Sequence, residues 1–348
     1  MNKMTPLLAD PVLSRQSERT REPGRISARS EPSAATGLLV FVAAAIGAYS
    51  FSLWYLDAYY GGDLAHYRNF YDAVARTQPA NWAKMQTFYI GSSEPAYRWL
   101  IGLSTYLDVT RIGFISFWNG ALVGAVSLIL YRYRVSPIFV VLLFTNFYFL
   151  ILLGPAERLK FAYLLFAFAF LIQQTHVRAG MALLSIFFHT QALVQFLSAG
   201  IYFVVENRRL IFENPTRVIL AVLGGAVVGS ISLYFFVSAV GNSILNKSQI
   251  YATRSEGLVE MIPWALLLFA GGYLFRGRLA YIAAMMPLGA LTFLFGNRTN
   301  IATLAMFATL AIFQRQTQHP VILAVMAYMS YKSISYFQNI LAYGSGFS

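Results

Sequence analysis

The chain has 348 residues, of which 57% are hydrophobic and only 11% are charged, and its formal net charge is +12. This balance is typical of a polytopic membrane protein and excludes an ordinary soluble domain. Because the chain has no cysteine and only four histidines, disulfides, thiolate nucleophiles and cysteine-based zinc sites are excluded, and a histidine-rich metal cluster is not expected. We attribute the positive charge to basic loops that set the topology and attract anionic lipid-linked groups, not to nucleic-acid binding.

The first 35 residues mix charge, serine and proline without hydrophobic periodicity. They are expected to form a disordered cytoplasmic tail, followed by a single transmembrane domain over residues 36–348. The first apolar run begins too far along the chain for a cleaved signal peptide. It is therefore expected to remain as a membrane anchor.

Apolar runs long enough to cross a bilayer, which takes roughly 17 to 25 residues, recur along the rest of the chain. They cover residues 36–56, 110–131, 135–153, 157–175, 216–240, 258–275, 279–296, 299–314 and 320–342. Two stretches fit poorly: residues 95–107 are too short to cross, and residues 178–205 are long for one span and carry His189 at their middle. We expect an all-α polytopic membrane protein with about ten or more transmembrane helices, some of them re-entrant or half-helices.

The short connections near residues 132–134, 175–178, 206–209, 276–278 and 314–319 are all basic. The positive-inside rule places them together in the cytoplasm with the amino terminus. This placement requires that residues 95–107 enter the membrane and return to the same side. It also requires that residues 178–205 form a hairpin of two half-spans. If residues 178–205 cross once, the face of everything after them inverts.

The polar residues between the other span ends would then share the extracytoplasmic face. One loop covers residues 57–94, including an interfacial helix, and another covers residues 241–257. Asp63, Tyr67 and Tyr71 share one helical face in the first loop, which suits either an interfacial helix or a carbohydrate site with stacking rings. The second loop, which includes Arg254, is either a lid over a substrate or a solvated connection.

Arg158 and Lys160 fall in the first turn of a predicted helix, within the stretch GPAERLK. Cations are disfavoured there by the helix dipole, so their presence makes sense if an anion such as pyrophosphate binds. The alternative is that Glu157 neutralises both side chains, which merely reach the interface.

Three further residues have competing interpretations. Arg298 lies in a short turn on the side that lacks other basic turns, so we expect either a functional residue or a structural ion pair. His189 suits either a neutral, hydrogen-bonded histidine inside the bundle or a proton acceptor at a hairpin tip. In SSEP, Ser93 or Glu94 suits a helix cap with Pro95 at the first helical position, and a cap would also fix a carboxylate for chemistry.

The order of five short motifs resembles the EpsG family of bacterial polysaccharide-assembly proteins and the wider group of Wzy-type polymerases. The motifs are GGDLAHYRNFYDAV, SSEPAYRWL, ERLKFAYLLFAFAF, FFHTQALV and GNRTNIATL, within residues 36–315. The resemblance points to Asp63 and Tyr67, Glu94 and Pro95, Arg158, His189 and Arg298. The chain departs from the family pattern at Ala96 and Leu159, where glycine and glutamine are more usual.

The resemblance implies a fold similar to the GT-C glycosyltransferases and a location in the bacterial inner membrane. It implies a polymerase that joins undecaprenyl-pyrophosphate-linked repeats of an O-antigen, capsule or exopolysaccharide outside the cytoplasm, without a metal or other cofactor. The expected partners are the lipid-linked oligosaccharide, membrane lipids, and a chain-length regulator and flippase of the same pathway.

For this reaction Glu94 is the expected general base, with Asp63 or His189 as substitutes. Arg158 and Arg298, helped by Lys160 and Arg254, are expected to bind the leaving pyrophosphate. Two other classes stay open: a flippase that binds the same lipid-linked glycan without bond formation, and a membrane acyltransferase that uses His189.

Overall fold

The computed structural model describes residues 33–92, 94–208, 213, 216 and 257–346. All secondary structure in these ranges is helical, in agreement with the predicted fold class. The span predicted over residues 216–240, most of the loop 241–257 with Arg254, and residues 1–32 of the tail lie outside the described residues.

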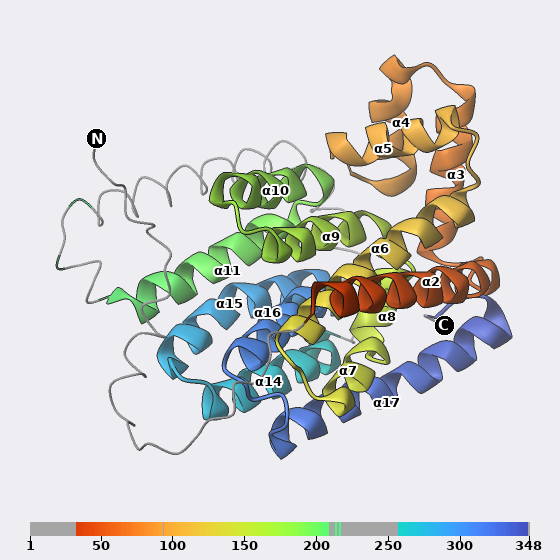
Figure 1. Ribbon diagram of the computed structural model, residues 1–348. Helices are drawn as coiled ribbons and strands as arrows, with labels where there is room; N and C mark the ends of the chain where they lie inside the picture. Colours follow the sequence, from red (N-terminus) through yellow and green to blue (C-terminus); the bar gives the residue numbers. More distant parts are fainter. Residues whose placement is uncertain (1–32, 93, 209–212, 214–215, 217–256, 347–348) are drawn as a thin grey trace. The chain divides into compact units, whose positions relative to one another are not determined.

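The elements follow one another in a nearly continuous helical chain (Figure 1). The first part comprises α2 (Ala34–Ala58), α3 (Asp63–Arg76), η1 (Pro79–Asn81), α4 (Trp82–Ile90), α5 (Pro95–Tyr106), α6 (Arg111–Arg132), α7 (Pro137–Phe144) and α8 (Phe147–Leu153). The second comprises α9 (Glu157–Leu171), α10 (Thr175–Phe188), α11 (Gln191–Glu206), α14 (Gly257–Leu274), α15 (Arg278–Phe295), η2 (Asn297–Thr299), α16 (Asn300–Phe313) and α17 (Pro320–Tyr343).

Three of the described helices, α2, α6 and α15, are long and apolar enough to cross a membrane. Four shorter apolar helices accompany them: Thr175–Phe188, Gln191–Glu206, Val259–Leu274 and Asn300–Phe313. The sequence predicted about ten spans, and one reason for the difference is visible at residues 135–153. There Asn146 accepts a hydrogen bond from the Tyr148 amide (2.9 Å) and begins a new helix, so the predicted single span is two short helices, α7 and α8.

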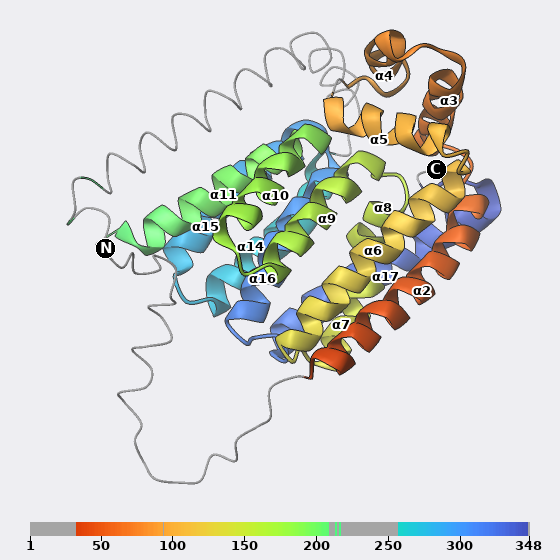
Figure 2. The same ribbon diagram turned by 45° about the horizontal axis from the view of Figure 1, so that its top comes forward.

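Helices α2 and α6 pack closely side by side (Figure 2). A Cβ atom added to Gly120 would lie 2.7 Å from the Ala45 carbonyl oxygen, and one on Gly124 would lie 2.9 Å from that of Phe41. The two glycines are four residues apart on α6, the spacing that lets transmembrane helices approach backbone to backbone. This contact holds α2 against α6, and the loop that leads to α3 begins at the end of α2.

The short basic connections meet at one end of the described helices. The contacts that join them are Arg132 Nη1 to the Leu171 carbonyl (3.3 Å), Arg178 Nη2 to the Ile172 carbonyl (2.8 Å), the Tyr133 ring with the Phe313 ring (5.2 Å), and the Arg276 amide to Gln314 Oε1 (2.7 Å). Glu206 at the end of α11 lines a pocket with Gly277. The shared end is the arrangement that the basic loops predicted.

Residues 178–205 form a hairpin, as predicted. Helix α10 ends at Phe188, α11 begins at Gln191, and His189 lies between them in an extended conformation. Gln191 Nε2 donates to the Thr299 carbonyl (3.3 Å), which places the tip beside η2 at the far end of α15. The short helix α5, with α3 and α4, lies at this same end (Figure 2).

Candidate functional site

Six of the eight residues singled out from the sequence lie close together at the end opposite the basic loops. We call them the charged cluster. It consists of Asp63, Tyr67, Glu94, Arg158, His189 and Arg298. Lys160 lies nearby but faces another way, and Arg254 lies outside the described residues.

Arg158 is the centre of the charged cluster. From the first turn of α9, its Nη1 donates to both carboxylate oxygens of Glu94, at 2.8 and 2.7 Å, and its Nε donates to the Tyr67 hydroxyl at 3.3 Å. Both charged side chains are largely buried, with 13% of Arg158 and 7% of Glu94 exposed. A carboxylate of the protein, Glu94, thus occupies the place at this helix start where the sequence predicted an external anion such as pyrophosphate.

Arg158 keeps hydrogen-bonding capacity. Within the described ranges, its Nη2 group donates no hydrogen bond to the protein. A guanidinium can bind two oxygens of one anion through parallel N–H groups. Arg158 can therefore accept an external anionic group in addition to, or in place of, Glu94.

Glu94 occupies the N-cap position of α5, with Pro95 at the first helical position as predicted. Of the two predicted caps, Ser93 or Glu94, it is thus Glu94 that takes the position, but its side chain makes no capping hydrogen bond and binds Arg158 through both oxygens instead. Burial raises the pKa of Glu94, but the charge of Arg158, aided by His189, outweighs it and lowers the pKa to about 2. Glu94 is therefore ionised and weakly basic while the pair is closed.

Asp63 and Arg298 form the outer ion pair of the charged cluster. Asp63 is the first residue of α3, where the helix dipole favours a carboxylate. Arg298 lies in η2, directly after Gly296 (φ 78°) and Asn297. Its side chain is 35% exposed and that of Asp63 is 38% exposed, so this pair is the more open to solvent.

Tyr67 follows Asp63 by one helical turn, but α3 does not present an open tyrosine face. Tyr67 and Tyr71 are 5% and 7% exposed, and the Tyr67 and Phe70 rings each lie 6.0 Å from the Tyr97 ring of α5. Burial raises the pKa of Tyr67 although Arg158 opposes it, so the hydroxyl stays neutral. The rings expected to lie at the membrane interface or to stack on sugars instead pack α3 against α5.

His189 joins the tip of the α10–α11 hairpin to the charged cluster. Its Nδ1 accepts a hydrogen bond from the Gln191 amide (3.0 Å), which caps the start of α11. It also lies close enough to Glu94 to affect that carboxylate electrostatically. The structural and functional interpretations of this histidine are therefore compatible.

Lys160 has a structural contact. Its side chain is completely buried, and Nζ donates to the Leu153 carbonyl at the end of α8 (2.8 Å). Asn119 of α6 donates to the same oxygen (2.8 Å). A cation at a helix C-terminus is favourable, so Lys160 stabilises the turn that precedes Arg158.

Glu157 does not pair with Arg158, but it acts electrostatically on Lys160, so the alternative interpretation of GPAERLK holds in part. Its two oxygens accept hydrogen bonds from Arg111 Nη1 (2.7 Å) and the Tyr97 hydroxyl (2.9 Å). Sequence reasoning missed Arg111. Arg111 is the first residue of α6, at the end of the helices that lacks basic loops. A cation at that end is the same signal that singled out Arg298.

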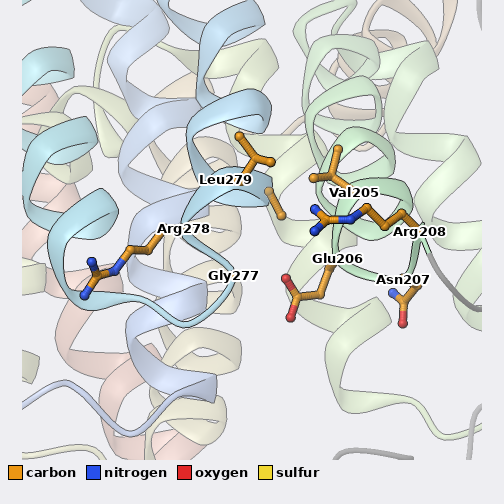
Figure 3. Close-up of a pocket in the computed structure, with 8 residues that line it drawn as sticks. Val205, Glu206, Asn207, Arg208, Gly277, Arg278 and Leu279 are labelled. Carbon is orange, nitrogen blue, oxygen red and sulfur yellow. The ribbon is translucent and has the colours of Figure 1, made fainter.

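The described part of the chain also has a pocket of about 350 Å³ at the opposite end of the helices. Figure 3 shows Glu206 and Arg208 at the end of α11 facing the connection at Gly277, while the Arg278 side chain is directed away from Glu206. This pocket belongs to the basic loops and is remote from the charged cluster. Within the described ranges, no three His, Asp or Glu side chains are grouped closely enough to hold a metal ion.

Comparisons with protein-family models, with curated proteins and with solved structures give no match. Membership of the EpsG family stays a prediction that rests on the five motifs.

Proposed function

We propose that this chain is a multi-pass bacterial inner-membrane polysaccharide polymerase similar to the Wzy type. It would have about ten spans, a GT-C-like arrangement, a cytoplasmic amino terminus, and the charged cluster on the periplasmic face. Its reaction joins undecaprenyl-pyrophosphate-linked oligosaccharide repeats of an O-antigen, capsule or exopolysaccharide, without a metal. A chain-length regulator and a flippase would act beside it.

The observation that carries this proposal is the ion pair of Arg158 with Glu94 at the start of α9. A guanidinium beside free helix amides is a site for an anion, and an internal carboxylate occupies it. A substrate pyrophosphate carries more charge than one carboxylate, so it can displace Glu94 from Arg158. Substrate binding and the release of Glu94 are then one event.

The release of Glu94 provides the base. While Arg158 holds it, the pKa of Glu94 is about 2, too low to take a proton from a sugar hydroxyl efficiently. Once Arg158 binds pyrophosphate, the carboxylate loses its cation inside a buried site, which raises its pKa. The base therefore becomes effective only when the donor is bound.

The proposed reaction is a glycosyl transfer. The acceptor hydroxyl attacks the anomeric carbon, its proton passes to Glu94, and the bond from that carbon to the pyrophosphate oxygen breaks. The electron pair leaves with the polyprenyl pyrophosphate, which Arg158 and Arg298 stabilise. Asp63 or His189 can replace Glu94 as the base, Lys160 acts indirectly by holding the turn before α9, and Arg254 remains a candidate for the same anion.

The test is complementation of a deletion strain with wild type, Glu94→Gln or Arg158→Ala, followed by sizing of the lipid-linked glycan. Both variants should accumulate single repeats on the periplasmic side. Arg68→Ala is the matched control, because Arg68 is an exposed arginine of α3 next to Tyr67 and its loss should leave long chains.

Two outcomes contradict the proposal. Unchanged long chains from a well-expressed Arg158→Ala protein would overturn the site. Single repeats trapped on the cytoplasmic side would identify the alternative, a flippase of the same lipid-linked glycan.

A further inference from the structure

Lys332 lies at the middle of α17 and has no role in the site described so far. It is twelve residues from Pro320 and eleven from Tyr343, which places it about 17 Å from either end of the helix. Its side chain is half-buried. A lysine in the interior of a predicted span is energetically costly, and such residues usually mark a substrate or ion pathway.

The charge of Lys332 is only partly compensated. Its ammonium lies 5.2 Å from the centre of the Phe147 ring of α8, a cation–π contact. Glu260 in the first turn of α14 also acts on it electrostatically. Yet the three close ion pairs found among the described residues do not include Lys332, so its ammonium can still bind an anionic group.

Two contacts connect Lys332 to the charged cluster. Tyr336 lies one turn further along α17, packs on Phe147 with ring centres 5.3 Å apart, and is close enough to affect Arg298 electrostatically. The Glu260 carboxylate lies against Gly296, where an added Cβ would be 2.5 Å from its Oε2. Gly296 opens the turn that carries Arg298, so Lys332 and Glu260 border the cluster.

The direction of α17 places Lys332 deeper than the charged cluster. The helix starts at the end with the basic loops and finishes at Gly344, whose carbonyl accepts a hydrogen bond from the Gly61 amide just before α3 (2.7 Å). Lys332 therefore lies further from the Asp63 end than Tyr336 does. In a lipid-linked donor the sugars are in the polar region, the polyprenyl chain is in the hydrocarbon, and the pyrophosphate lies between them.

We propose that Lys332 is a further substrate-binding residue, whose ammonium binds the pyrophosphate of the polyprenyl donor on the lipid side. The inference rests on the proposed function and adds a third cation below Arg158 and Arg298. Glu260 moderates the positive charge when no donor is bound. An acidic sugar could offer an anion too, but it would lie further out, beside Asp63.

The experiment measures binding of farnesyl pyrophosphate to the full-length purified protein in lipid nanodiscs by calorimetry at fixed ionic strength. Lys332→Met should raise the Kd about tenfold, because a hydrogen bond to a charged group is lost. Lys332→Arg should restore binding. Glu260→Gln should lower the Kd, because it removes a carboxylate that competes for the ammonium.

Two controls separate binding from stability and charge. Lys84→Met removes the same charge from an exposed position of α4 and should leave the Kd unchanged. A purely structural Lys332–Glu260 contact would make Lys332→Met and Glu260→Gln both less heat-stable and shift the Kd in the same direction. A raised Kd in Lys332→Met together with a lowered Kd in Glu260→Gln supports the inference. If Lys332→Met does not fold, Glu260→Gln decides alone, and an unchanged or raised Kd in that variant overturns the inference.

The remaining outcomes distinguish the inference from the function on which it rests. Loss of binding in Arg158→Ala with normal binding in Lys332→Met overturns the role of Lys332 alone. Failure of the wild type to bind farnesyl pyrophosphate overturns the proposed function together with the inference. Glucuronate is the second probe: if Lys332→Met weakens its binding instead, the ammonium recognises an acidic sugar and the pyrophosphate assignment is wrong.

Discussion

Two ion pairs begin at consecutive residues of α9 and differ in how the carboxylate is held. Glu157 is completely buried, and Arg111 and Tyr97 donate to its two oxygens. Arg158 alone donates to both oxygens of Glu94, through one nitrogen, and in the described part of the chain the second terminal nitrogen of each arginine donates to no group. The exposed fraction of the side chain is similar for the two arginines, 10% for Arg111 and 13% for Arg158.

Burial alone does not distinguish the two pairs. A carboxylate whose oxygens are satisfied by two fixed donors from different helices stabilises the fold and has little reason to exchange partners. Glu94 instead depends on one arginine for both of its oxygens, so it can leave when another anion takes that guanidinium. We therefore call Glu157 with Arg111 the structural pair, and Glu94 with Arg158 the functional pair of the proposed reaction.

The largest expected effect is on stability, at the structural pair. Glu157→Gln leaves Arg111 buried without its carboxylate and should lower the free energy of unfolding by about 3–5 kcal/mol. Thermal unfolding of the purified protein measures this loss. Adding Arg111→Gln should recover much of the stability and of the proposed polymerase activity, whereas Glu94→Gln with Arg158→Gln should recover stability alone. Recovery of activity in the second double variant would show that Glu94 and Arg158 are a structural pair as well.

The next effect is the acid dependence of the functional pair. The folded-state pKa of Glu94 is about 2, below its ordinary 4.5, so the ionised carboxylate stabilises the protein fully above about pH 4.5. This contribution, about 3 kcal/mol, should be lost as the pH falls from 4.5 to 2. The unfolding midpoint of wild type should therefore fall more steeply over this range than that of Glu94→Gln. Parallel curves would show that the pair contributes no stability.

The smallest stability change is expected at the outer pair. Asp63→Asn removes an ion pair in which both side chains are more than a third exposed. The free energy of unfolding should therefore change by less than about 1 kcal/mol. Glycan sizing should nevertheless reveal shorter chains, because Arg298 is no longer held over the site. A large loss of stability with normal chains would place Asp63 with Glu157, as a structural residue.

Several features could be predicted because each depends on local chemistry. Apolar runs predicted most helices, basic loops predicted a shared end, and the polar break at His189 predicted the α10–α11 hairpin. Arg158 and Arg298 were conspicuous because cations stood where neither the helix dipole nor the topology favours them. These signals are properties of single segments and do not require knowledge of the packing.

The pairing of these residues could not be predicted. Glu94 and Arg158 are 64 positions apart, and Asp63 and Arg298 are 235 apart, so their contacts depend on how the helices pack. Glu157 was the nearer candidate for Arg158 in the sequence, but the start of α6 brings Arg111 to it. Lys332 carries a signal in the sequence, a cation inside a predicted span, but only the packing shows its neighbours Phe147 and Glu260.

The turn before α9 has an energetic consequence for ligand binding. The Leu153 carbonyl accepts hydrogen bonds from both Lys160 and Asn119, which immobilises the chain just ahead of Arg158. The entropy of ordering this backbone is therefore lost during folding, before any ligand arrives. An anion that binds at Arg158 should therefore meet a preorganised site, and its binding need not include the cost of ordering this turn.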